Sequence, residues 1–80
     1  IMVKVRIFGM EGISAKDELY DASSLDELFS EICRKYGISR EMLYDCSIFV
    51  NGRNIAADNY MNINLKGGDE VQLLAMIVGG

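Results

Sequence analysis

The sequence predicts an α+β fold of two layers, in which a mixed sheet of four to five strands packs on one main helix. Three observations support this fold class. Residues 2–8 alternate apolar and polar side chains, residues 25–36 carry one apolar stripe at helical spacing, and residues 70–77 form a second apolar strand. Since 80 residues are the length of one domain, we expect a single domain, 1–80, that ends in a flexible tail, 77–80.

The first strand has the period of a half-buried strand. Val3, Val5 and Ile7 alternate with Lys4 and Arg6, so that apolar side chains face one side of the sheet and basic ones the other. The charged stretch 15–20 follows and favours an edge strand.

The main helix is bounded by residues that are typical of helix caps. Ser24 and Glu27 fit the capping box, in which the serine side chain accepts from the third residue and the glutamate reaches back. Gly37 suits a left-handed C-terminal cap, and a short helical turn over 39–44 follows. The apolar stripe between the caps consists of Leu25, Leu28, Phe29, Ile32, Cys33 and Tyr36.

The second half of the sequence predicts a hairpin and a final strand. Asn51-Gly52 is typical of a two-residue hairpin turn, because both residues tolerate positive φ. The turn joins a strand over 46–50 to a short return strand over 53–56. Residues 57–64 show no clear period, and their order is not predicted. The last strand spans 70–77.

This order of elements places the first and last strands side by side in the middle of the sheet. With the helix on one face, the opposite face keeps four apolar side chains uncovered: Phe8, Phe49, Leu74 and Met76. An exposed apolar patch commonly marks a partner surface. In the alternative interpretation, the irregular segment 57–64 covers part of the patch.

Charge and hydropathy exclude two classes of partner. Eight basic and twelve acidic residues give a net charge of −4, which argues against nucleic acid as a partner. A net negative charge is compatible with a protein partner that has a basic surface. In the alternative interpretation, the charge only keeps the domain soluble. No apolar run approaches the about 18 residues that span a membrane.

The chain contains two cysteines, Cys33 and Cys46, and no histidine. Two cysteines provide neither a disulfide framework nor zinc-site spacing, so we expect no metal and a reducing, cytoplasmic setting. Both thiols are expected to pack rather than react. Without histidine the commonest general base is missing, so an active site of the chain's own is not expected.

Three segments resemble one family of small proteins. VRIFGMEGISAKDEL is similar to the opening of the MoaD-type small subunit of molybdopterin synthase, and IFVNGRNI to the central hairpin shared by MoaD-type and ThiS-type sulfur carriers. KGGDEVQLLAMIVGG resembles their closing strand and terminal Gly-Gly. The resemblance covers nearly the whole chain and implies a ubiquitin-like β-grasp fold. The longer N-terminal region favours the MoaD branch, although the Pro-Pro pair common in MoaD-type tails is absent.

The resemblance implies a carrier whose reactive group is the C-terminal carboxylate of Gly80. In these families a ubiquitin-activating-like adenylyltransferase uses ATP to adenylate that carboxylate, and sulfur then replaces AMP to leave a thiocarboxylate. The carrier itself binds no cofactor. Gly79 would let the tail pass into a narrow active site because it has no Cβ, while Ile77 and Val78 would extend the partner surface. Alternatively, the final glycines are only a frayed terminus.

Three functions remain open from the sequence. A MoaD-like carrier would act with the large subunit of molybdopterin synthase, as the small subunit of that enzyme. A ThiS-like carrier would act with thiazole synthase in thiamin synthesis. The third alternative is a β-grasp interaction module without chemistry at its terminus.

Overall fold

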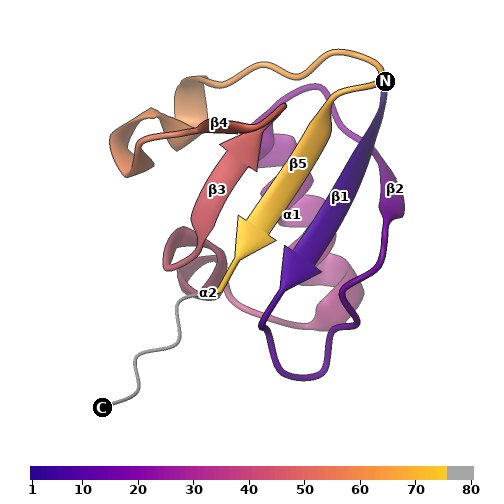
Figure 1. The fold of residues 1–80 in the computed structure, drawn as a ribbon, viewed down its shortest axis with the longest axis vertical. Helices are drawn as coiled ribbons and strands as arrows, with labels where there is room; N and C mark the ends of the chain where they lie inside the picture. The colour runs from indigo at the N-terminus through magenta and orange to yellow at the C-terminus, as the bar shows by residue number, and fades with distance from the viewer. Residues whose placement is uncertain (76–80) are drawn as a thin grey trace.

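The computed structural model describes residues 1–75 as one mixed five-stranded sheet with helices on one side of it (Figure 1). The strand order is β2-β1-β5-β3-β4. The elements are β1 (Met2–Phe8), β2 (Glu18–Asp21), α1 (Leu25–Tyr36), α2 (Arg40–Tyr44), β3 (Ser47–Val50), β4 (Arg53–Asn54), η1 (Ala57–Asn62, a 3₁₀ helix) and β5 (Glu70–Leu74). The predicted two-layer α+β architecture is confirmed, with five strands.

The two central strands run parallel and carry the apolar inner face of the sheet. Val5 pairs with Val71 and Ile7 with Leu73, while β2 and β3 flank this pair in antiparallel orientation. These four side chains are almost completely buried. Alternation along a strand therefore fixes which face meets the helix.

Helix α1 begins and ends as its sequence predicts. The Ser24 hydroxyl accepts from the backbone N–H of Glu27 at 3.1 Å, and Gly37 caps the other end with φ of 66°. The Glu27 carboxylate, expected to reach back to Ser24, accepts instead from the hydroxyl of Ser23 at 2.9 Å. The apolar stripe of α1 is buried against the sheet at Leu25, Leu28, Phe29 and Ile32 and half-buried at Cys33 and Tyr36.

Four strands are shorter than their patterns predict, and β3 differs least, since it begins at Ser47 rather than at residue 46. Strand β2 begins at Glu18 rather than at residue 15, because its pairing with β1 ends at the pair Val5 and Glu18. Strand β4 ends at Asn54, before the predicted 53–56 is complete. Strand β5 ends at Leu74, so Ala75 is not part of it, whereas residues 76–77 of the predicted strand and the tail 77–80 lie outside the described residues.

Residues 57–64, whose order the sequence does not predict, are ordered and contain the 3₁₀ helix η1. Tyr60 of η1 is buried, with its ring edge-on to Phe29 at 5.9 Å and its hydroxyl donating to the carbonyl oxygen of Cys46 at 3.3 Å. Since η1 packs beside α1 and α2, residues 57–62 leave the other face of the sheet open. No helix within residues 1–75 is long and apolar enough to cross a membrane.

Candidate functional site

Three apolar side chains meet on the open face of the sheet, and we call them the docking patch: Phe8, Phe49 and Leu74. Phe8 of β1 lies directly opposite Leu74 of β5. Phe49 of β3 pairs with Gln72, two residues before Leu74, so it is a diagonal neighbour of Leu74. The register therefore brings together three of the four side chains that the sequence assigns to this face.

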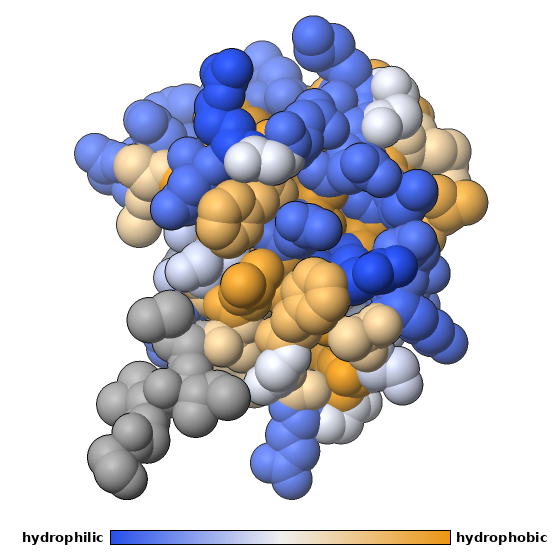
Figure 2. Space-filling view, viewed as in Figure 1, coloured by the Kyte–Doolittle hydropathy of each residue, from blue (hydrophilic) through white to orange (hydrophobic). Residues whose placement is uncertain are grey.

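The docking patch is accessible to a partner. Leu74 is 38% exposed, while Phe8 and Phe49 are half-buried by their neighbours. Figure 2 shows apolar atoms gathered on the lower half of this face, close to the end of the described chain, and hydrophilic atoms above them. The other predicted site residues, Met76, Ile77, Val78, Gly79 and Gly80, lie outside the described residues.

Paired charges border the docking patch on the same face. Lys4 forms an ion pair with Glu70 at 3.1 Å, and Arg6 with Asp17 at 2.8 Å. The Arg6 guanidinium also lies over the ring of Phe8, 5.8 Å from its centroid. Alternation in β1 predicts the place of Lys4 and Arg6, whereas Asp17 lies in the loop before β2, although the sequence assigns it to an edge strand over 15–20.

A buried carboxylate fixes the start of β5. Asp69 accepts hydrogen bonds from the side-chain amide of Asn51 at 3.0 Å and from the backbone N–H of Lys66 at 2.7 Å. These two donors hold the pKa of Asp69 below its usual value. The side chain of Asn51 also accepts from the N–H of Glu70 at 2.9 Å. The Gly-Asp-Glu-Val segment therefore ties the hairpin turn to β5, and so sets the position of Leu74.

The two thiols are placed for packing. Cys46 is buried and its Sγ donates to the carbonyl oxygen of Met42 at 3.4 Å, while Cys33 is half-buried on α1. Burial raises the pKa of both thiols, which keeps them protonated at neutral pH and weakens them as nucleophiles. Within residues 1–75 there is no group of three or more cysteine and carboxylate side chains that could hold a metal ion.

A scan against protein families matches residues 5–80 to the ThiS family. The chain belongs to the ThiS family. It is thus a sulfur carrier of the ThiS/MoaD group, as the three sequence segments suggest. A search of curated proteins finds no match.

Solved structures similar to this ThiS-family carrier include two molybdopterin-converting factors. A chain of the complex of subunits 1 and 2 of molybdopterin-converting factor from Helicobacter pylori is 35% identical, with a TM-score of 0.73 and 100% of both chains covered. The putative molybdopterin converting factor subunit 1 from Pyrococcus furiosus is 26% identical, with a TM-score of 0.67, covering 96% of this chain and 99% of that one.

A third similar structure supports the fold alone. The small archaeal modifier protein 1 from Methanosarcina acetivorans is 20% identical, with a TM-score of 0.79, covering 99% of this chain and 96% of that one. Together with the sheet order, this likeness confirms the ubiquitin-like β-grasp fold.

Proposed function

We propose that this ThiS-family carrier supplies sulfur for molybdopterin synthesis, as the small subunit of a molybdopterin synthase. One observation carries the proposal. The chain is similar over its full length, at 35% identity, to a chain of a two-subunit molybdopterin-converting factor complex. The second converting factor, from Pyrococcus furiosus, supports the same assignment at lower identity.

The proposed chemistry takes place on the carboxylate of Gly80. A carboxylate is a poor electrophile, so an adenylyltransferase partner first joins it to AMP from ATP and releases pyrophosphate. The outer sulfur of a persulfide then attacks the acyl carbon and AMP leaves. A thiol cleaves the resulting S–S bond, and a thiocarboxylate remains on Gly80. Gly79 and Gly80 allow close approach inside the partner's active site because neither has a Cβ.

We assign the docking patch to the large subunit of the synthase, with Met76, Ile77 and Val78 continuing the contact. The backbone N–H of Ala75 donates to the carbonyl oxygen of Phe8 at 2.9 Å, so the chain is held beside the patch as β5 ends. The five residues that follow Ala75 span about 17 Å when extended. A partner that covers the patch would therefore have the carrier's terminus within reach of a neighbouring active site.

Mass spectrometry of the intact chain tests the chemistry. After incubation with ATP, a cognate adenylyltransferase and a persulfide donor, we expect a gain equal to the exchange of one oxygen for one sulfur. A variant that lacks Gly79 and Gly80 should gain nothing. If the intact chain stays unmodified while a control carrier is loaded under the same conditions, the carrier proposal is wrong.

Binding experiments test the pathway. We expect the loaded chain to bind the large subunit of molybdopterin synthase more tightly than it binds thiazole synthase, as measured by calorimetry. The reverse preference would assign the carrier to thiazole synthesis and leave the sulfur-carrier chemistry intact.

A further inference from the structure

A second apolar surface lies on the flank formed by α2 and η1. It is a groove of about 400 Å³ lined by Tyr44, Ala57, Tyr60 and Met61. Tyr44 is 39% exposed and Met61 61% exposed, and both are large apolar side chains. None of the lining residues belongs to the docking patch, so the groove is a separate surface.

The aromatic wall of the groove is held in place by a hydrogen bond and a ring contact. The rings of Tyr44 and Tyr60 are stacked, with centroids 6.2 Å apart and an interplanar angle of 26°. Arg40 donates from Nε to the Tyr44 hydroxyl at 3.0 Å and is itself anchored by an ion pair with Asp26. Because Tyr44 is fixed before binding, a ligand would lose little affinity to the ordering of this side chain. Met61 adds a flexible wall that adapts to the shape of a partner.

Carboxylates without ion pairs are concentrated in the segments that form the groove. Within residues 1–75, most carboxylates form ion pairs or accept hydrogen bonds. The exceptions are Glu11, Glu41, Asp45 and Asp58. Three of these belong to the two segments that form the groove, because Glu41 lies in α2, Asp45 is the C-cap of α2 and Asp58 lies in η1.

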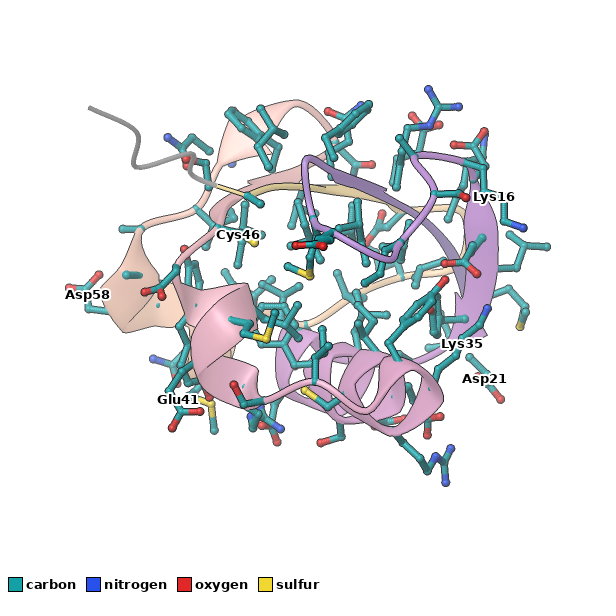
Figure 3. The ribbon with its side chains drawn as sticks, turned by 90° about the horizontal axis from the view of Figure 1, so that it is seen from below. Lys16, Asp21, Lys35, Glu41, Cys46 and Asp58 are labelled. Atoms are coloured by element: carbon teal, nitrogen blue, oxygen red, sulfur yellow. The ribbon has the colours of Figure 1, made fainter. Side chains whose placement is uncertain are left out.

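The one cation in these two segments does not offset their three carboxylates. Glu41 and Asp45 are like charges four residues apart, which repel across one helical turn. Arg40, which is the one cation within α2 and η1, is occupied by Asp26. Figure 3 shows Glu41 and Asp58 on the same flank, and Lys16 and Lys35 on the opposite flank. Residues 40–45 and 57–62, which form the groove, therefore carry a net negative charge that would favour a cationic partner.

We propose that this groove binds a basic segment of a protein partner, whose apolar side chain enters between Tyr44 and Met61. Lysine or arginine residues on either side of that apolar side chain would pair with Glu41, Asp45 and Asp58. The inference goes beyond the proposed function, because none of the residues that line the groove belongs to the docking patch.

A titration of the isotope-labelled chain with a basic peptide tests this inference by nuclear magnetic resonance. The probe is the capped peptide Arg-Lys-Leu-Leu-Lys-Arg, and the control is Glu-Asp-Leu-Leu-Asp-Glu. We expect saturable shifts of the amide signals of Tyr44, Tyr60 and Met61 with the basic peptide alone. Binding of the acidic peptide at the same sites, or shifts confined to other surfaces, would overturn the proposal.

Two pairs of matched variants separate the groove from general attraction to an acidic protein. Asp58→Asn and Met61→Ser should each weaken peptide binding roughly fivefold or more, as truncation of central contacts does. Glu11→Gln removes an equally unpaired carboxylate and Leu19→Ser an equally exposed apolar side chain, and both should bind within about twofold of the parent chain. If the control variants lose as much affinity for the peptide as the groove variants do, binding is not specific to the groove and the proposal is wrong. Shifts of the groove signals that grow with protein concentration, without peptide, would identify a second copy as the occupant.

Discussion

Leu73 and Leu74 are neighbours in β5, yet their side chains meet different surroundings. Leu73 is fully buried against the helix layer, whereas Leu74 is 38% exposed on the open face beside Phe8. This follows from the two-residue period of a strand, which places adjacent side chains on opposite faces of the sheet. The contrast allows a matched pair of substitutions.

We predict that Leu74→Glu weakens binding to the large subunit by about tenfold or more while it changes stability little, because a charge would then be desolvated at the centre of the contact. Leu73→Ala should instead cost about 2–5 kcal/mol of unfolding free energy, since it leaves a cavity in the core. Calorimetric binding and urea unfolding distinguish the two effects. Loss of folding in Leu74→Glu would mean that the open face is part of the core.

At the scale of single elements, α1 shows how much a local signal can decide. Its cap residues and its apolar stripe act within one stretch of chain, so they are visible in the sequence. The structure adds contacts from elsewhere, because the N–H of Leu25 donates to the carbonyl oxygen of Ile63 at 3.0 Å. The helix start is therefore fixed by its own serine and by the segment that follows η1.

We predict that Ser24→Ala lowers the free energy of unfolding by about 1 kcal/mol, because the N–H of Glu27 loses its acceptor. Ser23→Ala removes an exposed hydroxyl that donates to the Glu27 side chain, and it should cost less than about 0.5 kcal/mol. Urea unfolding monitored by circular dichroism measures both values. Equal costs would show that the cap does not set the stability of α1.

Edge strand β2 is joined to α1 by a cluster of polar side chains. The hydroxyl of Tyr36 donates to the Glu18 carboxylate at 2.5 Å, and Lys35 forms an ion pair with the same group. Burial alone would raise the pKa of Glu18, but the hydrogen bonds from Lys35 and Tyr36 outweigh it and lower that pKa. This cluster links an otherwise exposed strand to the helix layer.

At the scale of the whole molecule, Glu18 and Asp69 make stability depend on pH. Both carboxyl pKa values are lowered in the folded state, so their contribution is complete above the unfolded values and disappears as pH falls through the folded values. We predict a loss of unfolding free energy below about pH 4, close to the unfolded values. Urea unfolding at neutral and acidic pH measures this loss.

Asp69→Asn provides the comparison for the pH dependence. This variant should be less stable than the parent chain at neutral pH, and the difference should shrink in acid, where Asp69 of the parent chain becomes protonated. A constant difference at all pH values would show that the ionised form of Asp69 adds nothing to stability.

The sequence by itself determined the helix with its caps, the inner and outer faces of β1 and β5, and the hairpin at Asn51-Gly52, where φ is 51° and 80°. These features depend on periods and on conformational preferences within a few residues. Tertiary structure decided the order of η1, because Tyr60 is held by Phe29, far away in the chain. It also decided the partners of Arg6 and Asp69 and the acidic groove at Tyr44. Such contacts join distant segments, so no local pattern in the sequence encodes them.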